Sequence, residues 1–147
     1  MMARASLLVS IACILGCSAE SSPSTAGNSQ QTISHGRVTL VAHEIETGSP
    51  KGSSVQSGLD NATSVLNDLL QTDEFRTATG TLAGRFRLDS DGTVQMFLTD
   101  GATSIANADE SELENAFVGA AFSGKCSFPE LGDIAMVYAQ FKIDPPK

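Results

Sequence analysis

The sequence has few of the residue types on which catalytic and binding sites are commonly built. It contains no tryptophan, one tyrosine and two histidines, and it has nine Lys and Arg against 17 Asp and Glu, a formal net charge of −8. Without a basic stripe we do not expect a nucleic-acid partner. The acidic balance also argues against electrostatic docking onto anionic lipid headgroups. The shortage of aromatic residues leaves no platform for a substrate, so these absences favour a protein without catalytic activity.

Cysteine is also scarce, with three residues, two of which lie at positions 13 and 17. Cys126 is therefore the only thiol of the predicted mature chain, and Lys125 beside it could lower its pKa. No second cysteine is left to resolve an oxidised form, and no histidine can be placed next to it from the sequence. We interpret Cys126 as a buried or half-buried small apolar residue, with an intermolecular disulfide and a reactive thiol as alternatives.

The one long apolar run lies at the amino terminus. Arg4 precedes an apolar stretch, 5–15, whose length suits the central region of a signal peptide and is too short to span a membrane. The run ends in Ile14-Leu15-Gly16-Cys17, which resembles the lipobox of bacterial lipoproteins. The resemblance implies a signal peptide over 1–16, cleavage before Cys17, and diacylglycerol and acyl (palmitate) chains on that cysteine. These chains would form a membrane anchor.

Two alternatives to this processing can be stated from the residues. Cleavage after Ala19 would release a soluble periplasmic protein, whereas lipidation at Cys13 would leave too short an apolar run. Ser18 follows Cys17, and by resemblance to enterobacterial lipoproteins the absence of Asp there implies an outer-membrane lipoprotein that faces the periplasm. The segment 17–34 is rich in Ser, Thr, Asn and Gln, so we expect a flexible tether that reaches at most about 55–60 Å.

The clearest structural pattern is a hairpin between Thr81 and Thr99. Apolar residues alternate from 82 to 88 and again from 94 to 98, and Asp89-Ser90-Asp91-Gly92 separates the two runs. Alternation on both sides of an Asp-Gly turn is a strong signal for two antiparallel strands.

The remaining pattern predicts a single α+β domain over 35–147. We expect a first strand over 37–45, a loop over 47–57, and helices over 59–75 and 109–121. Asp73 and Glu74 oppose the dipole at the end of the first helix, so an end near Gln71 is the alternative. A last strand over 134–143 is apolar on both faces. The expected architecture is two helices packed on one face of a small antiparallel sheet of three to four strands.

The hairpin and the residues after it carry a resemblance to a known family. The run Gly80-Thr-Leu-Ala-Gly-Arg-Phe-Arg-Leu-Asp-Ser-Asp-Gly-Thr-Val resembles the central hairpin of TonB carboxy-terminal domains and of the related domain of gliding-motility proteins. Phe128-Pro129 before the last strand is similar to an element of the same family. The resemblance covers about 59–143 and implies a periplasmic protein-binding module that contacts its partner through a sheet edge. A lipobox and a short tether replace the family's membrane helix and long spacer, which puts energy transduction in doubt.

Three groups of polar residues resemble metal or catalytic sites, and each has a simpler structural interpretation. The turn 89–92 is similar to a calcium loop, but Arg87 and Leu98 stand where an EF-hand needs ligands. His35 and His43 would lie about 26 Å apart on one extended strand, too far to share a metal. A last group of carboxylates fits a solvated helix start better than a hydrolytic pair, and its members are Asp109, Glu110, Glu112 and Glu114. We therefore predict no catalytic residues, no metal and no cofactor.

The predicted function is that of a lipid-anchored module that binds another envelope protein. The last strand is the expected contact, as an exposed sheet edge that accepts a further strand. Its candidate partner-binding residues are Ile134, Met136, Tyr138, Gln140 and Lys142. Alternatively, both faces of this strand are buried, one under the helices and one in a homodimer, which would fit a structural lipoprotein that acts by self-association.

Overall fold

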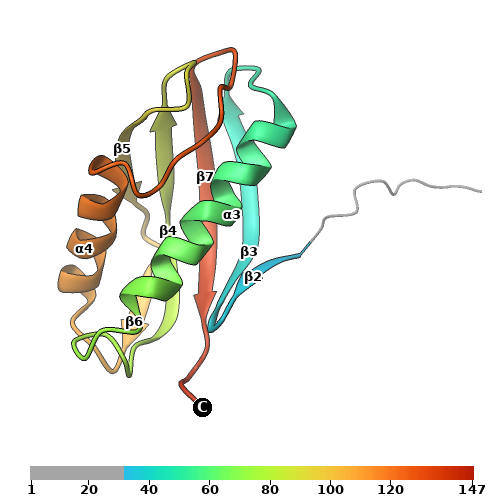
Figure 1. Ribbon diagram of the computed structural model, residues 1–147. Helices are drawn as coiled ribbons and strands as arrows, with labels where there is room; N and C mark the ends of the chain where they lie inside the picture. Colours follow the sequence, from blue (N-terminus) through green and yellow to red (C-terminus); the bar gives the residue numbers. More distant parts are fainter. Residues whose placement is uncertain (1–31) are drawn as a thin grey trace, which may run out of the picture. The chain divides into compact units, whose positions relative to one another are not determined.

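The computed structural model describes residues 32–147, which form one compact unit. Two helices and six strands make up this unit, in an α+β arrangement (Figure 1). The strands are β2 (Ile33–His35), β3 (Val38–Thr47), β4 (Thr79–Leu88), β5 (Val94–Thr99), β6 (Ser104–Ala106) and β7 (Ala135–Ile143). The helices are α3 (Gly52–Leu69) and α4 (Glu110–Phe122). Within the described range the first strand begins at Ile33, earlier than the expected domain boundary at 35, and the Ile33 side chain is buried in the core.

All strand pairs are antiparallel, and the sheet order is β2-β3-β7-β4-β5, with β6 also paired to β4. The sheet is thus larger than the three to four strands expected from the sequence. β2 and β6 are too short for alternation to reveal them. The expectation that the last strand is an edge is wrong, because β7 pairs with β3 on one side and with β4 on the other.

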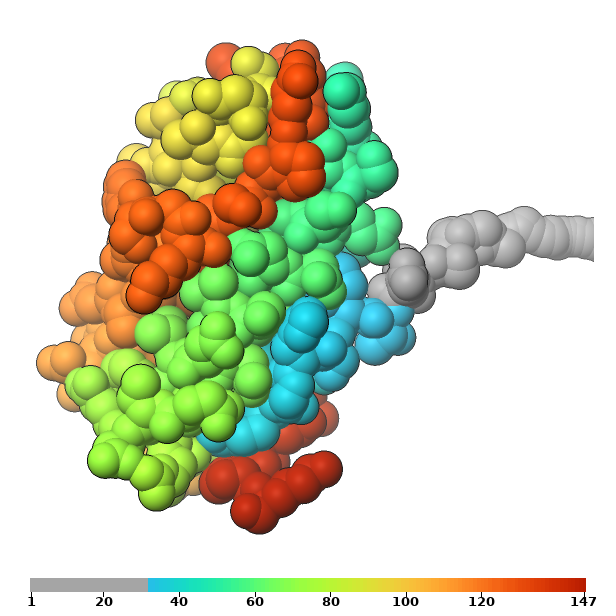
Figure 2. Space-filling model, viewed as in Figure 1, coloured from blue at the N-terminus to red at the C-terminus, as the bar shows by residue number. Residues whose placement is uncertain are grey.

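Both helices lie on the same face of the sheet (Figure 1). The space-filling view from this side shows α3, α4 and the segment 123–134 covering it (Figure 2). Buried side chains of β4 and β7 alternate toward this face, and three phenylalanines from different elements meet there: Phe86, Phe117 and Phe141. Ring centroids of Phe86 and Phe117 lie 6.2 Å apart, and those of Phe117 and Phe141 lie 5.9 Å apart. The core is therefore the layer between the helices and one face of the sheet.

α3 begins at Gly52, inside the stretch that the sequence indicated as a loop. Tertiary contacts hold this early start in place. The Lys51 N–H donates to the Leu131 carbonyl (2.9 Å), and the Ser54 hydroxyl donates to the Glu130 carbonyl (2.8 Å). The helix also ends earlier than expected, at Leu69, so Asp73 and Glu74 lie beyond its carboxyl end, where acidic side chains would oppose the helix dipole.

One glycine allows α3 to approach the segment 123–134 closely. A Cβ on Gly58 would lie 1.9 Å from Cδ2 of Phe128, well inside van der Waals contact. Phe128 is buried, and its ring centroid lies 5.4 Å from that of Phe86. The small side of α3 at Gly58 is therefore what admits Phe128 to the core.

The predicted hairpin is confirmed as β4 and β5. Gly92 has φ +94°, the Gly92 N–H donates to the Asp89 carbonyl (2.9 Å), and the Thr93 N–H donates to Asp91 Oδ1 (2.9 Å). The same turn is fixed from outside, since the Leu131 N–H donates to the Ser90 carbonyl (2.8 Å). The interpretation of 89–92 as a turn is thus confirmed.

Arg37 joins three segments that are far apart in the sequence. Its side chain donates to the carbonyls of Asp144 (2.9 Å), Arg76 (2.8 Å) and Ala78. The guanidinium therefore ties the β2–β3 turn to the chain before β4 and to the residues after β7.

Candidate binding surface

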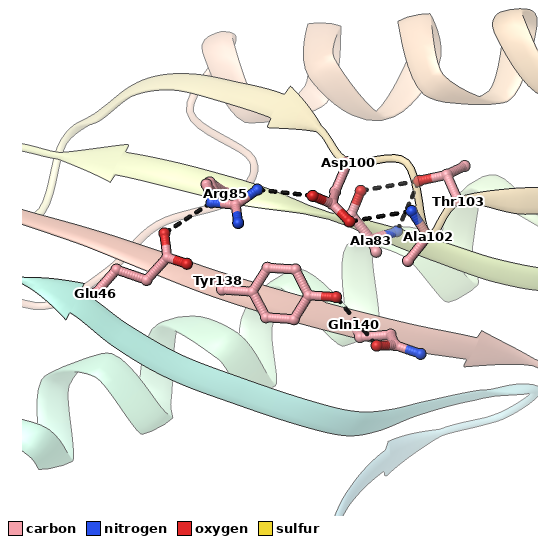
Figure 3. Close-up of polar contacts among 8 residues, drawn as sticks. All are labelled: Glu46, Ala83, Arg85, Asp100, Ala102, Thr103, Tyr138 and Gln140. Carbon is pink, nitrogen blue, oxygen red and sulfur yellow. Dashed lines mark hydrogen bonds and ion pairs between the residues drawn. The ribbon is translucent and has the colours of Figure 1, made fainter.

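The face of the sheet opposite the helices carries polar and half-buried side chains and is covered by neither helix (Figure 3). Cross-strand neighbours on this face follow from the register of β3, β7, β4 and β5. Glu44 pairs with Tyr138, Tyr138 with Arg85, and Arg85 with Leu98, so these four form one row across the sheet. We call this face the open face and this row the central row.

Arg85 is the centre of a polar cluster on the open face. Its Nε donates to Glu46 Oε1 (2.7 Å), and its Nη1 donates to Asp100 Oδ1 (2.8 Å) (Figure 3). Its Cζ also lies 5.3 Å from the centroid of the Tyr138 ring, a cation–π geometry. About a third of the Arg85 side chain remains exposed (35%).

The polar cluster changes the pKa of Arg85 and of Asp100. The hydrogen bonds that Arg85 donates to Glu46 and then to Asp100 raise the pKa of Arg85. The Arg85 hydrogen bond, followed by that of the Ala102 N–H (3.0 Å), lowers the pKa of Asp100. Arg85 is thus fully charged, and both of its anionic partners are already bonded to it.

A shallow hollow of about 280 Å³ lies over this cluster, lined by Glu44, Glu46, Arg85, Asp100 and Tyr138. Three carboxylates and one guanidinium give the lining an excess of negative charge. Glu44 makes no ion pair or side-chain hydrogen bond with any residue of the range 32–147. The hollow can accept a further positive group at the Glu44 carboxylate.

β3 borders the hollow and provides an unpaired strand edge. β2 pairs only with Val38–Leu40, so from Val41 to Thr47 the outer side of β3 has no backbone partner within the described range. All residues of this stretch are exposed, including two large apolar ones, Val41 (49%) and Ile45 (39%). We call 41–47 the β3 edge. The register shifts at Leu40/Ala42 and at Ile45/Thr47 are bulges, which natural edges also use to limit unwanted pairing.

The five residues predicted as partner-binding do not form an edge. The predicted residues are Ile134, Met136, Tyr138, Gln140 and Lys142. Ile134 is exposed and lies just before β7. The other four project from β7 toward the open face, where the first three are half-buried and Lys142 is exposed. The alternating residues of β7 are buried against the helices. The backbone of β7 is occupied on both sides, so strand addition there is excluded, although these side chains still line the open face.

The other candidate residues lie apart from one another. Gly36, with φ +56°, reverses the chain between His35 and His43, so the two are on different strands, and His35 Nε2 lies 2.9 Å from Asp60 Oδ1. In the part of the chain that the structure describes, no three His, Cys, Asp or Glu side chains are grouped as a metal site. Cys126 is buried, as predicted, and burial raises its pKa to about 12.

The acidic residues near 109–114 form the start of α4, as the sequence indicated. Asp109 is the N-cap, and its Oδ1 accepts from the Glu112 N–H (3.1 Å). Glu110 Oε2 accepts from the Ile105 N–H (2.9 Å), and partial burial, with a smaller contribution from Glu110, raises the pKa of Glu114. The carboxylates of Asp109 and Glu110 thus accept hydrogen bonds from backbone N–H groups at the start of α4.

Sequence reasoning missed the polar cluster and the β3 edge. The one available signal was a matched charge pattern in two strands: two glutamates at 44 and 46, and two arginines at 85 and 87, each pair at the spacing that places both side chains on one face. It became interpretable only once β7 was known to lie between β3 and β4.

Cys17, the predicted signal peptide and most of the tether lie outside the described residues. Neither α3 nor α4 is both long enough and apolar enough to cross a bilayer. Comparisons with known proteins gave no match: no family model, no curated protein and no solved structure is significantly similar to this chain.

Proposed function

We propose that this protein is a lipid-anchored, periplasm-facing binding module of the outer membrane, without catalytic activity, that accepts an extended segment of another envelope protein. The observation that carries the proposal is the unpaired β3 edge. An added strand satisfies the free backbone groups of an edge and gains main-chain hydrogen bonds without a pocket. Val41 and Ile45 provide exposed apolar contacts for its side chains.

The anchor is proposed from the lipobox alone, with Cys17 as the lipidated residue. Metabolic labelling with a radioactive or alkyne-tagged palmitate tests it. We expect label on the wild type and on Cys13→Ser, and none on Cys17→Ser, because the thioether and the new amino terminus both require that cysteine. Label retained on Cys17→Ser would refute the anchor and favour cleavage after Ala19.

The edge proposal is tested by site-specific photo-crosslinking in living cells. A photoreactive residue replaces Val41 on the β3 edge. The matched control replaces Phe122, which is more exposed (61%) and is the last residue of α4, the helix that packs near β5 at the other edge of the sheet. We expect a discrete adduct with another protein at position 41 alone. Reduced hydrogen exchange of residues 41–47 in the isolated complex is expected as well, because the added strand bonds the edge.

Other results contradict the proposal. Absence of an adduct at 41, or equal adducts at 41 and 122, would exclude a specific edge contact. An adduct of twice the protein's mass would instead support the alternative, a structural lipoprotein that pairs with its own copies.

A further inference from the structure

Resting on the proposed function, we infer that the segment accepted by β3 is basic, with a Lys or Arg side chain beside Glu44 at the border of the hollow. Strand addition alone does not specify side chains, so the chemistry of the open face must supply the selectivity. The inference therefore concerns which segment binds, and it can fail while strand addition itself stands.

Negative charge gathers near the β3 edge. β3 carries Glu44 and Glu46 and contains no Lys or Arg between Val38 and Thr47. Of the basic residues on the open face, Arg85 of β4 is already held by two carboxylates. Lys142 of β7 lies opposite Thr39, toward the other end of β3, and Arg87 of β4 lies opposite Met136. Glu44, at the outer end of the central row, is the carboxylate left without a cation. The border that a new strand would meet is thus negative.

The geometry of an added strand also places a side chain beside Glu44. In an antiparallel pair, Cβ atoms of directly opposite residues lie about 4.5–5.5 Å apart on the same face. A residue opposite Glu44 would project over the open face and continue the central row outward. From there a Lys or Arg side chain reaches the Glu44 carboxylate, and the Tyr138 ring beyond it offers a second favourable contact for a cation.

A second copy of this chain is a poor occupant of the β3 edge, because its own charges repel. If two β3 edges paired antiparallel about His43, the exposed Val41 and Ile45 would meet, but the Glu44 side chains would be diagonal neighbours on one face. Other nearby registers place Glu44 opposite Glu44 or Glu46 of the other copy. Like charges at such positions destabilise a pair, and each copy carries a net charge of −8.

The test uses the full chain in detergent micelles and capped, fluorescent peptides seven residues long. One peptide alternates Val and Lys, the second alternates Val and Glu, and the third is the Val–Lys peptide with a central Pro, which lacks a backbone N–H. Fluorescence anisotropy measures the Kd of each at low salt. We expect the Val–Lys peptide to bind at least about fivefold more tightly than the Val–Glu peptide, with the preference reduced at high salt. The proline peptide is expected to bind poorly.

Charge reversal locates the effect. Glu44→Lys should abolish or invert the preference, whereas Glu112→Lys, an equal charge change on α4, should keep it. Glu44 and Glu112 are both exposed, so both variants are expected to fold, and circular dichroism checks this.

Each other outcome is decisive. Equal affinities for the Val–Lys and Val–Glu peptides, no binding of either, or an equal effect of the two substitutions would overturn the inference. If both charged peptides bind equally and the proline peptide does not, strand addition survives and only the basic preference is lost. If the proline peptide binds as well as its parent, the contact is mere charge attraction, and the proposed edge function fails too. Dimers formed through residues 41–47 would favour a second copy and also overturn it.

Discussion

Replacing Gly58 of α3 with alanine is expected to destabilise the domain, although alanine is the better helix former. In a helix interior the exchange should contribute about 1 kcal/mol of stability. Here the new methyl group would lie 1.9, 2.2 and 2.3 Å from three ring carbons of Phe128. Carbon atoms normally approach to about 3.5–4.0 Å, so the ring must move by roughly 1.5–2 Å.

The Phe128 ring has little room to move. It is 5% exposed and packs against Phe86, with 5.4 Å between ring centroids. Overpacking costs about 1–3 kcal/mol, and the disturbed aromatic pair adds about 0.5–1.5 kcal/mol. After the helix contribution is subtracted, the free energy of unfolding should fall by about 0.5–3.5 kcal/mol. For a domain of this size that corresponds to a Tm lower by roughly 2–14 °C.

Gly119 of α4 is the matched control. It is also inside a helix, and a Cβ there would meet nothing within 4 Å. Gly119→Ala should therefore raise the free energy of unfolding by about 0.5–1 kcal/mol, opposite in sign to Gly58→Ala. Urea titration and thermal circular dichroism measure the stability of both variants. In a Phe128→Leu background, Gly58→Ala should lower the free energy of unfolding by less. Equal stabilisation by the two alanines would refute the close approach of α3 and Phe128.

Three further predictions concern single side chains. The buried Cys126 thiol, with its pKa raised to about 12 from 9.0, should resist alkylation at pH 8 until the protein is unfolded. Because unfolding lowers that pKa, its contribution to stability is complete below pH 9 and should be lost as the pH rises toward 12. Arg85→Ala should raise the pKa of Asp100, since the main hydrogen bond that lowers it is removed, and an NMR pH titration of the carboxyl carbon measures this; an unchanged pKa would contradict the pairing. Arg37→Ala should lower the urea midpoint by the equivalent of about 1.5–3 kcal/mol, and Arg37→Lys should restore only part, because one ammonium cannot reach all three carbonyls.

Local chemistry explains which parts of the fold could be predicted from the sequence. The β4–β5 hairpin and the start of α4 depend on neighbours in the chain: an Asp-Gly turn with Gly92 at positive φ, and an Asp109 cap. Both were predictable. The start of α3 depends instead on Leu131 and Glu130, more than 70 residues away, and no local pattern indicates such bonds.

The place of β7 in the sheet could not be predicted for a similar reason. Periodicity assigns a residue to a face, but strand order depends on long-range pairing that a single sequence does not reveal. The alternation of β7 did place Met136, Tyr138 and Gln140 together on one face. The unpaired edge instead belongs to β3, whose exposure follows from the shortness of β2.

The central position of β7 has a consequence for the timing of folding. β2 and β3 come early in the chain, and β4 and β5 follow them, but the two groups are joined only through Ala135–Ile143. The sheet therefore cannot close until the chain has emerged as far as Ile143, and until then its two halves expose unpaired edges and the faces that will form the core. Such late closure would suit the proposed export of this chain, because a sheet that is not yet closed stays open during transport and can be completed in one cooperative step afterwards.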